Sequence, residues 1–129
     1  MKKFVYSTFV ILFFAVSSIY AQDSMKNLIL NKDLKIEKLV IKNEDLSYSL
    51  GSVNIREDVW IEYDKNGKEI GKANVLEFTE DRIQIKWIFA ENGADVGDIT
   101  IYNYEKSNGK VVFNILFDDK EQGFFEAML

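Results

Sequence analysis

The 129 residues of this chain include no cysteine, no histidine and no proline. Without Cys and His, Ser–His and Cys–His nucleophile pairs are excluded, and so are metal sites built from imidazole or thiolate ligands. No disulfide can form, so hydrophobic burial has to hold the fold together. The absence of Pro means that no strand pattern is interrupted on that ground. Carboxylates, a Ser–Lys pair or Tyr remain as the possible catalytic groups.

The chain begins with a pattern typical of export. Lys2 and Lys3 precede an apolar run over Phe4–Val16, and small and polar residues then lead to Ala21. This pattern predicts a secretory signal peptide over 1–21 and a single β domain over 22–129. The alternative is a membrane anchor, but a run of about 13 residues falls short of the roughly 20 that span a bilayer. We therefore expect a bacterial periplasmic or extracellular protein without stable membrane insertion after cleavage.

A basic patch is also missing. Without Lys2 and Lys3, 14 of the 16 basic residues remain against 21 acidic ones, so the mature net charge would be −7. Such a surface argues against nucleic acid and anionic membranes as partners.

Alternating hydrophobicity is the strongest pattern present. In the stretch Val75–Phe89, apolar residues fall on every second position on both sides of the polar segment Thr79–Arg82. A period of two predicts strands with one buried face, here Ile83, Ile85, Trp87 and Phe89. The later chain repeats this pattern, with Val111, Phe113, Ile115 and Phe117 on one face.

Turn signals separate these runs. Asn66-Gly67 and Asn108-Gly109 predict hairpins, and Gly71 predicts a bulge or bend. A strand is predicted over about Lys35–Lys42, with a helix as the alternative, while Asp23–Asn31 fits a helix or a strand. In the turn-rich segment Asn43–Glu57, the alternation of Leu46, Tyr48 and Leu50 predicts a short strand or a loop that folds back over the core. A further turn is predicted over Asp118–Gly123, before a closing strand over Phe124–Leu129. The predicted fold is all-β: an antiparallel meander of six to eight strands closing into a small barrel or half-barrel.

The order of strands and turns over Asp58–Leu129 resembles the small bacterial lipocalin-like domains. The resemblance rests on Leu76-Glu77-Phe78-Thr79-Glu80-Asp81, on Gly97-Asp98 and on Ser107-Asn108-Gly109-Lys110, each between alternating strands. It implies an exported or envelope-attached meander. The Gly-x-Trp that opens such barrels is missing, because Asp58-Val59 precedes Trp60, and no functional residue is carried over.

Acidic residues are the first candidates for chemistry. They occur as adjacent pairs: Glu44-Asp45, Glu57-Asp58, Glu80-Asp81 and Asp118-Asp119. Glycoside hydrolysis needs two carboxyls about 5–9.5 Å apart in a cleft, whereas neighbours on a strand point apart. We interpret the pairs as solvated turn charges. Asp64-Lys65-Asn66-Gly67 lacks the spacing of a calcium loop and is interpreted as a turn, and no metal or cofactor is predicted.

Aromatic residues are the remaining candidates. Trp87 shares a face with predicted core residues. Trp60 opposes Val59, Ile61 and Tyr63, and Tyr102 and Tyr104 oppose Ile99 and Ile101. On that parity the last three aromatics would point outward. The candidate ligand-binding residues are Trp60, Trp87, Tyr102 and Tyr104, because Trp and Tyr combine large contact area with a polar group.

These observations favour a non-enzymatic binding domain for a small apolar molecule, a glycan or a protein. The alternatives are a structural or inhibitory protein–protein module of the cell envelope and, at lower weight, a carboxylate-based hydrolase. The large inward side chains predict that a barrel of this size is filled.

Overall fold

The computed structural model describes residues 24–91 and 93–129, so the predicted leader lies outside the described residues. In chain order the elements are α2 (Met25–Ile29), β1 (Asp33–Ile41), β2 (Glu44–Asp45), the 3-10 turn η1 (Ser47–Ser49), β3 (Ser52–Ile55), β4 (Val59–Tyr63), β5 (Glu69–Phe78), β6 (Arg82–Ala90), β7 (Ile99–Ser107), β8 (Lys110–Phe117) and β9 (Lys120–Met128). The all-β prediction is confirmed.

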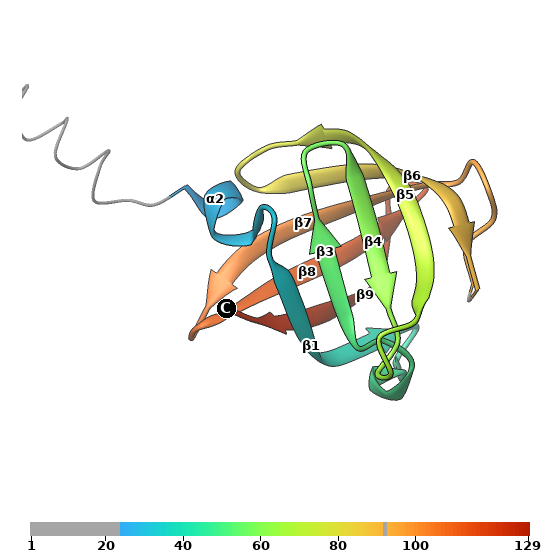
Figure 1. The fold of residues 1–129 in the computed structure, drawn as a ribbon, viewed down its shortest axis with the longest axis horizontal. Helices are drawn as coiled ribbons and strands as arrows, with labels where there is room; N and C mark the ends of the chain where they lie inside the picture. Colours follow the sequence, from blue (N-terminus) through green and yellow to red (C-terminus); the bar gives the residue numbers. More distant parts are fainter. Residues whose placement is uncertain (1–23, 92) are drawn as a thin grey trace, which may run out of the picture.

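The strands form a closed antiparallel barrel (Figure 1). Each strand from β3 to β8 pairs with the next one along the chain. β1 closes the ring, because Asp33–Lys35 pair with β3 and Ile36–Ile41 pair with β9. β2 is an extra strand that pairs with β1. The predicted barrel is therefore confirmed with eight strands, and closure removes the exposed edges that an open sheet would carry.

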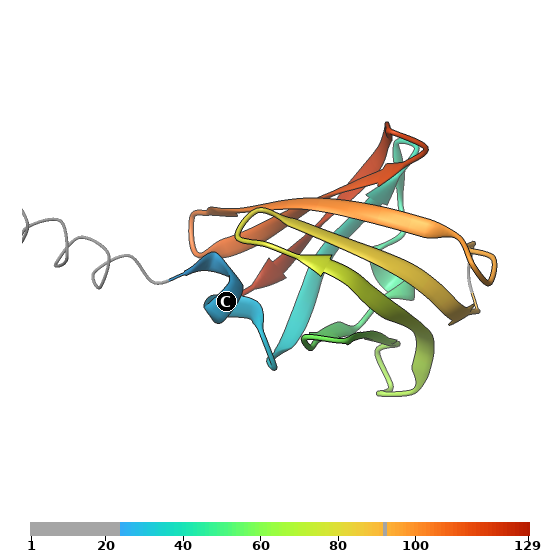
Figure 2. The ribbon, with the colours of Figure 1, turned by 90° about the horizontal axis from the view of Figure 1, so that it is seen from above.

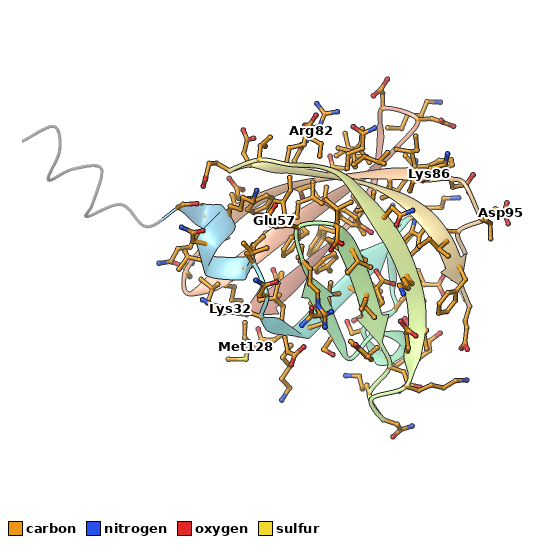
Figure 3. The ribbon with its side chains drawn as sticks, turned by 45° about the horizontal axis from the view of Figure 1, so that its top comes forward. Lys32, Glu57, Arg82, Lys86, Asp95 and Met128 are labelled. Carbon is orange, nitrogen blue, oxygen red and sulfur yellow. The ribbon has the colours of Figure 1, made fainter. Side chains whose placement is uncertain are left out.

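The barrel has two different ends, which lie on opposite sides of the ribbon in Figure 2. The helix end carries α2 and the connections 56–58, 79–81 and 108–109. The loop end carries the connections 42–51, 64–68, 91–98 and 118–119. In Figure 3, Glu57 and Lys32 lie toward the helix end, whereas Asp95 lies at the loop end.

Helix α2 covers the helix end. Ser24 caps it by accepting a hydrogen bond from the Asn27 backbone N–H at 3.2 Å. The carboxylate of Glu80, in the β5–β6 turn, accepts from the Ser24 hydroxyl at 2.5 Å and from the Lys26 backbone N–H at 3.2 Å. Ile29, the last residue of the helix, is fully buried against the barrel core. The ambiguous segment thus forms a helix, while Asp33–Ile41 forms the predicted strand. Among the described residues, no helix is long and apolar enough to cross a membrane.

Two of the predicted buried faces are confirmed. On β6, Ile83, Ile85 and Trp87 are buried, but Phe89 does not share their face, because the bulge after Trp87 pairs it with Lys72 on the outer side. On β8, Val111 and Phe113 are fully buried, Ile115 is partly buried and Phe117 is 38% exposed. The inward face of β8 therefore becomes more exposed toward the loop end.

The predicted faces of β4 and β7 are wrong. Trp60 is fully buried inside the barrel, and Val59 and Tyr63 are only partly buried. On β7, Thr100, Tyr102 and Tyr104 point inward, whereas Ile99 is 41% exposed. The physical reason is size: an indole or phenol ring removes more area from water than an isoleucine, so the barrel interior takes the rings. Ile61 is buried as well, so both faces of β4 are covered at that point.

The seam between β1 and β9 depends on Gly123. This residue pairs with Ile41 on β1 and Ile115 on β8. A Cβ at Gly123 would lie 1.9 Å from the Val40 carbonyl oxygen and 2.9 Å from the Ile41 Cα. Gly123 thus marks a close approach between the backbones of β9 and β1.

The predicted turn over Asp118–Gly123 is too long, because β9 already begins at Lys120.

We predict that Gly123→Ala loosens this seam. The added methyl cannot fit against β1 without moving backbone, so the free energy of unfolding should fall by roughly 2 kcal/mol or more. Urea denaturation followed by circular dichroism measures the change. Gly109→Asn is the matched control: its φ is +79° and no atom lies within 4 Å of its Cβ position. Asn tolerates such a φ, so the control should lose about 1 kcal/mol or less. Equal stability of Gly123→Ala and the native chain would contradict this description of the seam.

Candidate functional site

The four aromatic residues predicted from sequence all lie on the interior of the barrel. Trp60, Trp87, Tyr102 and Tyr104 are each exposed by 6% or less. Trp60, Tyr102 and Tyr104 therefore do not form the outward surface that their parity predicted. The structure distributes the four residues over three levels: the centre of the barrel, the helix end and the loop end.

Trp60 and Tyr102 belong to the central group of rings, which we call the aromatic core: Trp60, Tyr102, Phe113 and Phe125. The Trp60 and Tyr102 rings stack with centroids 4.4 Å apart, and Phe113 and Phe125 stack at the same separation. The two stacks meet edge to face, with Trp60 6.1 Å from both phenylalanines. Such pairs are each worth about 0.5–1.5 kcal/mol beyond area burial. The centre of the barrel is thus filled with side chains.

Tyr104 lies toward the helix end and has a structural role there. Its ring stacks on Phe113 with centroids 5.6 Å apart, and its hydroxyl donates a hydrogen bond to the Thr79 carbonyl oxygen. Burial raises the pKa of Tyr104, and the nearby Glu80 and Asp81 raise it further. Tyr104 is therefore a neutral phenol that ties the β5–β6 turn to the interior.

Trp87 lies toward the loop end, next to an inward-facing acid. Its indole N–H donates to the buried Thr100 hydroxyl at 2.9 Å. A Cβ at Gly71, on β5, would meet the Trp87 Cζ3 at 3.1 Å and the Glu62 Oε1 at 3.3 Å. Gly71 pairs with Glu62, and the ladder shifts register directly after this pair, which confirms the predicted bulge. The missing side chain at Gly71 leaves the space in which Glu62 and Trp87 lie side by side.

Glu62 is a candidate functional residue that the sequence patterns do not indicate. It follows Trp60 by two positions on β4, so both side chains face the interior. The Trp60 indole N–H donates to Glu62 Oε2 at 3.0 Å. The parity that predicts an outward Trp60 also predicts an outward side chain two positions later, at Glu62. The signal that could have found it is a glycine in the neighbouring strand, which leaves room for a large inward side chain.

The surroundings of Glu62 favour its neutral form. The residue as a whole is partly exposed, but its carboxyl lies against Trp60, Gly71 and Trp87. Burial raises the pKa of Glu62 from 4.5 to about 7, against the opposing effect of the Trp60 hydrogen bond. Burial also raises the pKa of Tyr102, and the nearby Glu62 carboxylate adds to that shift. Glu62 is thus a carboxyl that changes charge near neutral pH inside an aromatic environment.

The other sequence candidates stay at the surface. All eight residues of the paired acids are exposed, as predicted. Asp64-Lys65-Asn66-Gly67 is a turn in which Asp64 accepts from the backbone N–H groups of Asn66 and Lys68 at 2.9 Å. In the part of the chain that the structure describes, no three acids gather as a metal site would require.

Comparison of the chain with protein-family models, with curated proteins and with solved structures gives no match.

We predict that Trp60→Ala destabilises the protein strongly. It removes the central stack and leaves the Glu62 carboxyl without its indole donor. The expected loss is about 3–5 kcal/mol in the free energy of unfolding. Tyr48→Ala is the control, since Tyr48 is 73% exposed and its loss should change stability by no more than about 0.5 kcal/mol. Similar small effects of both changes in urea denaturation would mean that Trp60 is not in the core.

We also predict a pH dependence of stability that comes from Glu62. The folded-state pKa of about 7 exceeds the ordinary 4.5, so the folded state holds the proton more tightly than the unfolded chain. The stabilising contribution of protonated Glu62 is complete below about pH 4.5 and is lost as the pH rises to about 7. The Glu62→Gln variant does not lose this stability, because a glutamine side chain does not ionise. Between pH 4.5 and 8, its free energy of unfolding should therefore rise by up to about 3 kcal/mol relative to that of the native chain.

Denaturation of both proteins at several pH values measures this difference. Glu69→Gln is the control, because Glu69 is an exposed acid at the same end of the barrel. The free energy of unfolding of the Glu69→Gln variant should change with pH as that of the native chain does. A constant difference between Glu62→Gln and the native chain would contradict the raised pKa.

Proposed function

We propose that this chain is an exported, non-enzymatic binding domain that takes a small ligand at the loop end of the barrel. The observation that carries the proposal is the inward-facing Glu62 beside Trp87, a polar group in a largely apolar setting. Ligand sites typically combine apolar walls with a few polar groups that fix orientation. At the loop end, Trp87 supplies an apolar wall and Glu62 a polar group, and both residues lie on strands of the barrel.

Partly exposed interior residues support the loop end over the centre. The aromatic core is almost completely buried and leaves that level filled. At the loop end, Ile41, Glu62, Ala90 and Ile115 are partly exposed, and the three apolar ones pack on the core. Leu46 and Leu50 of the connection 42–51 also pack on the core at this end, so a ligand bound here would lie beside them and leave the aromatic core in place.

Export and the relationship to lipocalin-like domains belong to the same proposal. The eight-stranded meander closed by its first and last strands, with a short helix at one end, supports the resemblance in architecture. The basic and apolar start of the sequence supports export to the periplasm or the outside of a bacterial cell. The acidic balance of the chain supports a ligand other than nucleic acid.

The hydrolase alternative is less well supported by this geometry. Two carboxyls must act together in that chemistry, one of them with a raised pKa. Glu62 has the raised pKa, but burial and the Trp60 indole, rather than a second carboxyl, determine it. We therefore assign Glu62 to binding.

A protein–protein module remains the second candidate, because one outer face carries exposed apolar residues. Ile88 and Ile99 are each 41% exposed, and Val96 is 74% exposed. Lys86 pairs with Ile99, so Ile99 lies on the outer face of β7, and the exposed Ile88 follows Lys86 by two positions at the β6 bulge. Binding at this face would leave the interior side chains unaffected.

The two Trp residues allow a direct test. The chain contains Trp60 and Trp87 and no other tryptophan, so its ¹H–¹⁵N spectrum has two indole signals, both from the interior. Trp87→Phe assigns them. Titration with single-chain amphiphiles and short oligosaccharides should shift at least one indole signal in a saturable manner. Shifts confined to the amides of Ile88 and Ile99 would favour the protein–protein module instead. Unchanged indole signals throughout would contradict a ligand at the loop end.

A further inference from the structure

Glu62 is an interior acid without a cationic partner. Among residues 24–91 and 93–129, no lysine or arginine forms an ion pair with it. Its Oε2 accepts from Trp60, and its Oε1 has no hydrogen-bond donor among these residues. The neighbours on either side of β4 are Val53 and Gly71, which carry no charge, and Tyr102 on β7 is the titratable group near the carboxyl. Oε1 is not among the fully enclosed, unpartnered side-chain atoms of these residues, so water or a small cation can reach it from outside the protein.

The stability of the fold does not depend on a negative charge at Glu62. A glutamine would accept the same hydrogen bond from Trp60 and would avoid burying a carboxylate. Gly71 makes the inward position possible, because a side chain there would press on both Glu62 and Trp87. A glycine within a strand weakens the strand. The buried acid at Glu62 on β4 and the glycine at Gly71 on β5 are therefore both unfavourable for stability, and together they allow one carboxyl to face inward. Such an arrangement is typical of a functional site.

The surroundings restrict the kind of cation. A metal ion prefers several oxygen ligands, and the described residues offer no group of three acids. Glu62 offers one unpaired carboxylate oxygen beside an indole, and partly exposed Ile41, Ala90 and Ile115 lie at the same end. Aromatic rings attract organic cations, and apolar side chains attract their hydrocarbon groups.

We propose that the loop end binds a small organic cation, an ammonium group with an apolar substituent, and that Glu62 is its counterion. The proposal rests on the proposed function and specifies the ligand class. The ammonium group donates to Glu62 Oε1 while Trp60 continues to donate to Oε2. The substituent lies against Ile41 and Ile115. Since the bound cation requires the ionised carboxyl, binding below neutral pH releases a proton from Glu62.

The test compares three probes of equal chain length: octylammonium, octanol and octanoate. Each is titrated at pH 8 into the full domain, and the indole signals of Trp60 and Trp87 report binding. We expect octylammonium to bind at least about tenfold more tightly than octanol, and octanoate to bind most weakly, because a charge-assisted hydrogen bond contributes about 1.5–3 kcal/mol. With a Glu62 pKa of about 7, the octylammonium affinity should be about tenfold lower at pH 6 than at pH 8.

Two variants separate the site from the acidic surface. Glu62→Gln keeps the acceptor for Trp60, and it should lower octylammonium affinity at least about tenfold while octanol affinity stays within about twofold. Glu69→Gln removes an exposed charge at the same end and should change neither. Equal binding of octylammonium and octanol, or octylammonium binding unaffected by Glu62→Gln, would overturn the cation assignment and leave a neutral-ligand site. Indole signals that move with none of the three probes would overturn the cation assignment and count against the loop-end site itself.

Discussion

The stacking of Trp60 on Tyr102 is the contact on which the rest of this barrel depends. The two rings come from β4 and β7, and they meet the Phe113–Phe125 stack from β8 and β9. One group of rings therefore links four strands across the interior. The chain has no cysteine, so the burial of these four rings, and no disulfide, holds the strands together. Closure between β1 and β9 then places the last strand over the same rings, with Phe125 paired to Leu39.

The inward direction of Trp60 also determines the electrostatics of the loop end. A side chain two positions later on a strand points the same way, so Glu62 must enter the barrel with Trp60. The indole N–H gives the carboxyl one hydrogen bond, but the loss of water around it outweighs that bond and raises its pKa. The same geometry that fills the centre thus produces a titratable group at the end of the barrel opposite α2.

Local patterns predicted the fold well because strand periodicity and turn chemistry are local properties. Asn66-Gly67 and Asn108-Gly109 form turns in which Gly67 and Gly109 have positive φ, and the alternation of Ile83, Ile85 and Trp87 identifies the inner face of β6. The faces of β4 and β7 could not be assigned in this way, because Ile61 is buried on one parity and Trp60 on the other. Whether Trp60 or Ile61 faces the interior depends on packing partners that are distant in sequence, such as Tyr102. The helix over Met25–Ile29 likewise depends on Glu80, 54 residues beyond Lys26.

The candidate site was predicted in part. Trp60, Trp87 and Tyr102 were singled out for their chemistry, but their inward direction and the role of Glu62 depend on which strand lies beside which. Gly71 shows this most clearly: its meaning follows from the pairing with Glu62 and the proximity of Trp87. Sequence spacing places Gly71 nine residues from Glu62 and 16 from Trp87 and indicates neither contact.

The central claim is that Trp60 lies inside a closed barrel, in contact with rings from β7 and β9. Nuclear Overhauser effects from the Trp60 indole protons test it most directly. The structure predicts strong effects to the ring protons of Tyr102 and Phe125, together with cross-strand effects between the backbones of Leu39 and Phe125. A Trp60 indole that shows no effects to these rings and exchanges its N–H rapidly with water would contradict the account.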